Sequence, residues 1–170
     1  QTYTLPASVD MRLVQGDSTD ELLLQLQIHS TAGFSGLLSA VTVTIRYDSA
    51  SATSLGPNTS FCTNWSPFFA SPAVYHAGIA YRTYNGFGFN LLADPPASGG
   101  CGVAFVPGAW FTVSAVPVIG SCPAFTLGND AWTGPQNRDY YMSMEGVDVT
   151  GVVVSGPVAA GSCAVDCNGV

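Results

Sequence analysis

Two stretches of alternating apolar and polar residues, 22–29 and 41–48, constrain the fold of this chain most strongly. Leucine and isoleucine alternate with glutamine in the first stretch, and valine and isoleucine alternate with threonine in the second. A period of two puts successive side chains on opposite faces of a β-strand, so each stretch predicts a strand with one buried and one solvated face. We expect four residues of the buried faces to lie fully in the core: Leu24, Leu26, Val43 and Ile45.

Shorter alternating or β-branched segments continue this pattern along the chain, at 9–14, 74–81, 84–91, 109–116, 124–127, 140–144 and 147–154. Turn-forming residues separate them, and no window of eleven residues has convincing helical periodicity. About nine or ten strands at this spacing predict an all-β fold, an antiparallel β-sandwich. We expect the sandwich to span residues 1–157 and residues 158–170 to form a linker or the start of a Cys-containing repeat.

Two local expectations follow from turn chemistry and edge protection. Segments 74–81 and 84–91 are predicted to form a hairpin, with Asn85-Gly86 near a turn. Segment 147–154 is β-branched and carries one charge, Asp148. It could be a central strand, or an edge strand that a neighbouring subunit extends by strand addition, and residues 1–5 could offer a similar edge.

The composition excludes two classes of partner. The chain has 170 residues, no lysine, four arginines and a net charge of −7. Nucleic-acid binding requires clustered Lys and Arg, which this sequence lacks. The apolar runs are of strand length, well short of the ~20 residues that a membrane-spanning helix needs, so membrane insertion is not expected.

Five cysteines in an acidic, lysine-free chain indicate an extracellular or cell-surface protein with disulfides and one thiol left over. A zinc site is the alternative, but no Cys-x-x-Cys motif occurs. Cys62 and Cys101 flank the predicted hairpin, whose ends must lie close together, so this pair is a disulfide candidate. Cys163 and Cys167 could pair with each other, or either could pair with Cys122. The opening Gln-Thr-Tyr resembles a mature N-terminus after processing.

No residue pattern indicates catalysis or a required cofactor. His29 and His76 are the only histidines, and no Gly-x-Ser-x-Gly motif accompanies them. Asp17, Asp20 and Glu21 lie close in sequence and are candidate calcium ligands, although the segment lacks the complete spacing of an EF-hand. The alternative is a solvated turn, in which aspartate is favoured by local hydrogen bonding.

Aromatic residues and serine hydroxyl groups supply the remaining candidates for ligand binding and for modification. Trp65 and Trp132 fall in predicted loops and could stack on glycans, while Trp110 lies in a strand and could face either way. Asp17-Ser18-Thr19 and Asp48-Ser49-Ala50 resemble an O-glycosylation motif of the Bacteroidota, and this resemblance makes Ser18 and Ser49 candidate O-glycosylation sites.

Segment 9–56 resembles a known family in the run Met11-Arg12-Leu13, the alternating strands, and the motifs Phe34-Ser35-Gly36-Leu37-Leu38-Ser39 and Ser54-Leu55-Gly56. These features are similar to cohesin-like or immunoglobulin-like modules of large exported proteins of the Bacteroidota, many of them sent out by type IX secretion. The tail Asp166-Cys167-Asn168-Gly169-Val170 is similar to the start of the Asp-Cys-Asn-Gly repeats that often follow such modules. The resemblance implies a cohesin-like, jelly-roll or immunoglobulin-like sandwich.

These observations favour a non-enzymatic extracellular β-sandwich that serves as a structural or adhesive subunit of a cell-surface assembly, with a polymeric filament as one form. Self-association or other surface proteins are the expected partners. The alternative is a carbohydrate-binding or cohesin-type protein-binding module, for which surface-exposed Trp65 and Trp132 would be the main support.

Overall fold

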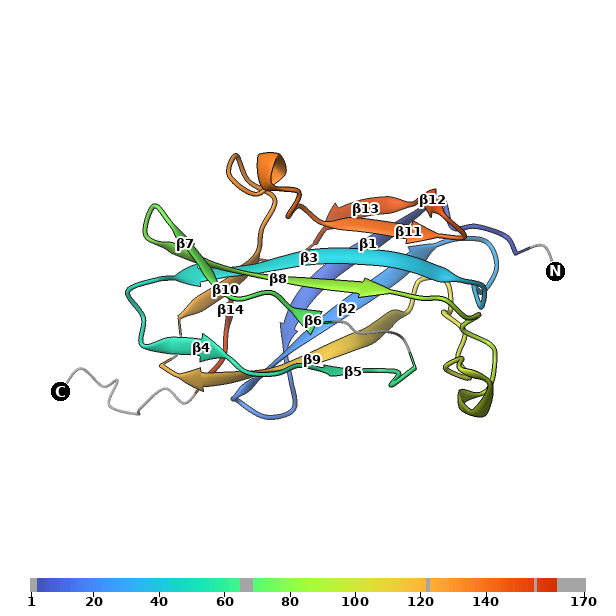
Figure 1. The fold of residues 1–170 in the computed structure, drawn as a ribbon, viewed down its shortest axis with the longest axis horizontal. Helices are drawn as coiled ribbons and strands as arrows, with labels where there is room; N and C mark the ends of the chain where they lie inside the picture. The colour runs from blue at the N-terminus through green and yellow to red at the C-terminus, as the bar shows by residue number, and fades with distance from the viewer. Residues whose placement is uncertain (1–2, 65–68, 122, 155, 162–170) are drawn as a thin grey trace.

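The computed structural model describes residues 3–64, 69–121, 123–154 and 156–161. Its fold is all-β, with 49% of residues in strands and 4% in helical turns, and two sheets stack face to face (Figure 1). The sandwich predicted from the alternating pattern is confirmed. The described segments contain fourteen strands, more than predicted, because several loops carry two-residue strands. No helix in the described segments is long and apolar enough to span a membrane.

The first sheet has the order β13-β1-β2-β9-β4, and β5 also pairs with β9. Its strands are β1 (Ser8–Gln15), β2 (Glu21–His29), β4 (Thr53–Leu55), β5 (Thr59–Ser60), β9 (Trp110–Gly120) and β13 (Thr150–Val153). The strands pair antiparallel except for β13, which runs parallel to β1. Strands β1, β2 and β9 therefore occupy the interior of this sheet.

The second sheet is built on β3 (Leu38–Asp48), which pairs along one side with β8 (Ile79–Phe87). Along its other side β3 pairs first with β11 and then with β10. The remaining members are β6 (Phe69–Ala70), β7 (Val74–His76), β10 (Ala124–Leu127), β11 (Tyr141–Met144), β12 (Val147–Asp148) and β14 (Val158–Ala159). Two 3-10 turns, η1 (Pro96–Ser98) and η2 (Gly134–Gln136), lie in loops.

The core lies between the two sheets and contains the residues that the alternating pattern selects. Leu24, Leu26 and Ile45 have no exposed surface, and Val43 is 1% exposed. Phe34, in the loop before β3, is also fully buried and pairs with Phe105 through a β-bridge. The predicted register of both long strands is therefore confirmed.

The predicted hairpin of segments 74–81 and 84–91 is wrong in its boundaries. The turn lies at Ala77-Gly78, both with positive φ, and it joins β7 to the single long strand β8. Asn85-Gly86 lies within β8, opposite Thr42 and Val41 of β3. Pairing along the full length of β3 outweighs the local turn preference of Asn-Gly.

Segment 147–154 does not form one strand. It divides into β12, at an edge of the second sheet, and β13, at an edge of the first sheet. The hydrogen bond from the Thr150 N–H to the Asp148 carboxylate lies at the point where the chain changes sheets. The expectation of a central strand is therefore wrong.

The C-terminal part of the described chain adds to the sandwich beyond residue 157. Strand β14 pairs with β10, and the Gly161 N–H donates to the Thr19 carbonyl. Ala160 is buried in the core. Strand β14, Ala160 and Gly161 thus contact the described sandwich.

Candidate functional site

The outer face of the second sheet is the best candidate for a binding surface. Cross-strand register aligns Tyr141 of β11, Thr42 of β3 and Asn85 of β8 in one row. In the adjacent row, Phe87 lies opposite Ala40. The side chains of Thr42 and Asn85 are joined by a hydrogen bond of 2.9 Å between Thr42 Oγ1 and Asn85 Oδ1. We name this surface the β11-β3-β8 face.

Two aromatic side chains on this face are exposed to solvent. Tyr141 is 39% exposed and Phe87 is 45% exposed. Both extend from strands of a sheet whose opposite side is the protein core, so their backbones are held rigidly. Rigid, exposed aromatic groups on a flat surface are typical of protein–protein interfaces.

The loop between β10 and β11, residues 128–140, covers the other half of the same face. It buries the hydroxyl groups of Thr44 and Thr83, which lie 2.9 Å apart. Thr44 Oγ1 also donates to the Arg138 carbonyl, and Arg138 Nη1 donates to Thr83 Oγ1. The covered half is thus a satisfied polar network, and the β11-β3-β8 face is the half left open.

Asp130 fixes this loop to the sheet. Its carboxylate accepts hydrogen bonds from the backbone N–H groups of Trp132 and Thr133, from Tyr81 Oη and from Arg46 Nη1. Burial alone would raise the pKa of Asp130, but these donors outweigh it and lower the pKa to about 2. Asp130 is therefore ionised at neutral pH, and its role is structural.

Trp132, a predicted ligand-stacking residue, packs within this loop. Its ring lies 4.3 Å from that of Tyr81 and stacks on His76 at 5.5 Å, and the Arg138 guanidinium lies 5.5 Å from its centroid. The side chain is half-buried. These contacts occupy much of the ring that a glycan would need. Trp65, the other predicted residue, lies outside the described residues.

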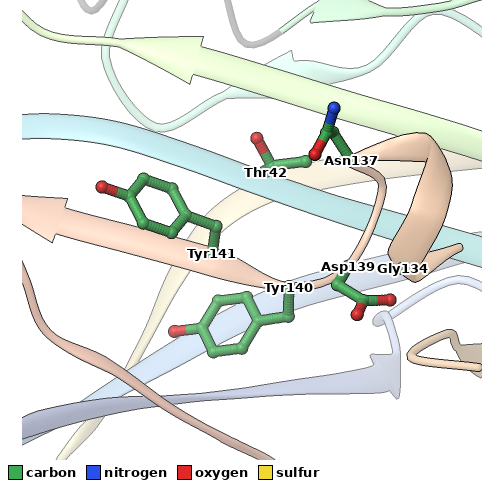
Figure 2. Close-up of a pocket in the computed structure, with 6 residues that line it drawn as sticks. All are labelled: Thr42, Gly134, Asn137, Asp139, Tyr140 and Tyr141. Carbon is green, nitrogen blue, oxygen red and sulfur yellow. The ribbon is translucent and has the colours of Figure 1, made fainter.

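A shallow hollow of about 330 Å³ adjoins the β11-β3-β8 face. Its lining comes from β3, from the loop containing η2 and from the start of β11: Thr42, Gly134, Asn137, Asp139, Tyr140 and Tyr141. Figure 2 shows Asn137 next to Thr42, with Tyr141 extending along β11. The hollow has room for one or two side chains of a partner. It therefore gives an otherwise flat face a concave site for binding.

The two histidines are not arranged for catalysis. His29 is exposed, and its Nε2 lies 2.6 Å from Asp10 Oδ2 on the first sheet. His76 is exposed on β7, not at the edge of the core, and stacks on Trp132. Within the described segments, no serine or cysteine hydrogen-bonds to either ring. A nucleophile–histidine–acid arrangement is not assembled by these residues.

The candidate calcium ligands Asp17, Asp20 and Glu21 lie in and after the β1–β2 turn. Among the described residues, no group of three or more His, Cys, Asp or Glu side chains is placed to hold a metal ion. The Ser18 hydroxyl accepts a hydrogen bond from the Asp20 N–H, as in a solvated turn. Ser18 is exposed, whereas Ser49 is half-buried, so Ser18 is the more accessible of the two candidate glycosylation sites.

Cys62 and Cys101 are joined by a disulfide. It ties the segment after β5 to the loop containing η1, and Asn64 Nδ2 reinforces the link by donating to the Pro96 and Gly100 carbonyls. The other three cysteines, Cys122, Cys163 and Cys167, lie outside the described residues.

Sequence reasoning did not identify Phe87 as a surface residue, because Asn85-Gly86 was interpreted as a turn. Once these residues are placed within β8, alternation with the buried Tyr84 and Gly86 puts Phe87 on the outer face. Tyr141 is the other exposed aromatic residue of this face. Its signal is the alternation with the fully buried Met142.

Comparison with solved structures gives the fold a name. A chain in the type I cohesin–dockerin complex of Clostridium thermocellum matches 94% of this chain over 96% of its own length, with a TM-score of 0.50 and 12% identity. The chain has a cohesin-like fold. Two further structures are similar. The solution structure of CaCohA2 from Clostridium acetobutylicum has 13% identity and a TM-score of 0.48, and the match covers 91% of this chain and 92% of that one. A non-cellulosomal cohesin from Archaeoglobus fulgidus has 6% identity and a TM-score of 0.44, with the same coverage of the two chains.

No protein-family model matches the sequence, and no curated protein sequence matches it significantly. At 12% identity the structural similarity establishes the fold alone. Function has to be argued from the surfaces of this cohesin-like sandwich.

Proposed function

We propose that this chain is a non-enzymatic, exported protein-binding module that holds its partner on the β11-β3-β8 face. The observation that carries the proposal is the exposure of Phe87 and Tyr141 on this rigid face, next to a hollow. Exposed aromatic groups on an otherwise polar surface serve as anchors that a partner protein buries.

The character of the face favours a protein over a small molecule. The hollow is open and shallow, whereas small-molecule sites enclose most of the ligand surface. The similar Clostridium thermocellum structure is a cohesin–dockerin complex, in which two proteins are bound to each other. A cohesin-like chain with an open aromatic face is therefore best explained as one half of a protein pair.

Export is supported by two properties of the chain. It contains no lysine, and the disulfide between Cys62 and Cys101 requires an oxidising environment to persist. An extracellular or cell-surface location agrees with both.

The proposal is tested by affinity capture with the immobilised protein, followed by titration of the purified partner. We expect Phe87→Asp and Tyr141→Asp each to weaken partner binding at least tenfold, because each puts a charge at the centre of the interface. Val106→Asp is the matched control, since Val106 is 61% exposed in a loop outside this face. Equal loss of affinity in the control and the two face variants would contradict the proposal.

A structural or adhesive role by self-association is the second candidate. It is favoured by the edge strand β13, because Val152 within the strand and Val154 directly after it are 61% and 52% exposed and lysine is absent. Such an edge could accept a strand from a second copy, and repetition would produce a filament.

A further inference from the structure

The outer face of the first sheet carries a second ordered surface, on the opposite side of the molecule from the β11-β3-β8 face. Cross-strand register aligns Arg12 of β1, Gln25 of β2 and Thr112 of β9. Trp110 of β9 lies one row away, opposite Gln27. We name these side chains the Arg12–Trp110 platform.

Hydrogen bonds hold the platform in one conformation. Arg12 Nε donates to Gln25 Oε1 at 2.8 Å, and Gln25 Nε2 donates to Thr112 Oγ1 at 3.0 Å. The Arg12 guanidinium stacks 4.1 Å from the centroid of the Trp110 ring. Stacking and the single Nε bond together fix the plane of the guanidinium group.

The terminal amino groups of Arg12 are unused in the described part of the chain. Nη1 and Nη2 donate no hydrogen bond to these residues, and no carboxylate among them pairs with Arg12. In contrast, Arg46 is paired with Asp130, and Arg138 donates to Thr83. A fixed guanidinium with two free donors matches the two oxygens of a carboxylate.

The local charge is suitable for an anion although the whole chain is acidic. Strands β1, β2 and β9 contain two acidic residues, Asp10 and Glu21. Both oxygens of Asp10 are engaged, by the His29 ring and by the Val152 N–H. Glu21 lies at the far end of β2, beside Gly16. The row formed by Arg12, Gln25 and Thr112 therefore contains no acidic residue.

The neighbouring groups indicate the kind of molecule that carries the carboxylate. Strands β1, β2 and β9 are interior strands, so a peptide cannot bind here by main-chain pairing. What the surface offers is amide and hydroxyl groups around a guanidinium that itself covers the Trp110 ring, a combination suited to hydrogen bonding with a ligand rich in hydroxyl groups. We propose that the Arg12–Trp110 platform binds a glycan that contains uronate residues, with Arg12 holding the sugar carboxylate.

The test is a titration of the intact protein with trigalacturonate, followed by calorimetry or by chemical shifts of a ¹⁵N-labelled sample. We expect saturable binding, lost on methyl esterification of the sugar carboxylates. Arg12→Gln should weaken binding at least tenfold. Gln25→Glu should also weaken binding at least tenfold although Arg12 is kept, because the new carboxylate pairs with the Arg12 guanidinium in place of the sugar carboxylate. Arg138→Gln, which removes the same charge from the loop that covers the opposite sheet, should change the affinity less than twofold.

Three outcomes would overturn this inference. They are no binding of trigalacturonate, equal binding of its methyl ester, and equal or tighter binding of a glutamate tripeptide, which would assign the platform to acidic peptides. Because the platform and the β11-β3-β8 face lie on different sheets, each proposal can fail without the other.

Discussion

At the scale of single residues, the core predicts the largest effects on stability. Leu24 and Ile45 are fully buried on opposing sheets. Replacing either with alanine removes apolar contacts and leaves a cavity, so we expect Leu24→Ala and Ile45→Ala each to lower the free energy of unfolding by about 2–5 kcal/mol. Val152→Ala, at an exposed position, should change it by less than about 0.5 kcal/mol. Urea denaturation measures all three, and losses below about 1 kcal/mol at both core sites would refute the register.

Asp130 gives a prediction that depends on pH. Its pKa is lowered from 3.8 to about 2 in the folded protein, so it stabilises the fold above pH 4, and this contribution is lost as the pH falls towards 2. The shift corresponds to about 2 kcal/mol at neutral pH. We expect Asp130→Asn to be less stable than the wild type by up to about this amount at pH 7, with the difference shrinking between pH 4 and pH 2. A difference that is independent of pH would be inconsistent with this role.

At the scale of elements, the disulfide between Cys62 and Cys101 fastens an irregular region to the sandwich. The two residues are 39 apart in sequence. Closing a loop of that length in the unfolded chain corresponds to about 4 kcal/mol in the chain-entropy description. Peptide mapping under non-reducing conditions should recover the linked pair. The double variant Cys62→Ala/Cys101→Ala should unfold at a lower temperature than the wild type. Because this disulfide is already absent from the double variant, its reduction cannot lower the unfolding temperature of that variant further.

Long alternating elements could be predicted from the sequence, and short or irregular ones could not. The segments around Leu24 and Ile45 repeat with a period of two over eight residues, which determines both the strand and its buried face. Asn85-Gly86 illustrates the limit, because its turn preference is local whereas the pairing of β3 with β8 is long-range. The proposed binding face could not be predicted from local patterns for the same reason, since Phe87, Tyr141 and Thr42 come together only through strand pairing. The contact of Arg12 with Trp110 depends in the same way on the order β1-β2-β9.

At the scale of the whole molecule, the two candidate functions predict different behaviour in solution. Self-association through β13 predicts assemblies larger than a monomer at micromolar concentration, and Val152→Lys should dissociate them by placing a charge on the edge. Sedimentation with and without reductant measures this and separates covalent from non-covalent assembly. A single monomeric species in both conditions would exclude self-association and leave the protein-binding module as the function.

The central claim is that a partner protein covers the β11-β3-β8 face. Hydroxyl-radical footprinting of the free and partner-bound protein tests it most directly, because aromatic side chains report their own exposure on each side of the sandwich. We predict that Tyr141 and Phe87 become protected in the complex, while Trp110 on the first sheet and the exposed Tyr75 on β7 keep their reactivity. Protection of Trp110 with unchanged reactivity of Tyr141 and Phe87 would contradict the claim.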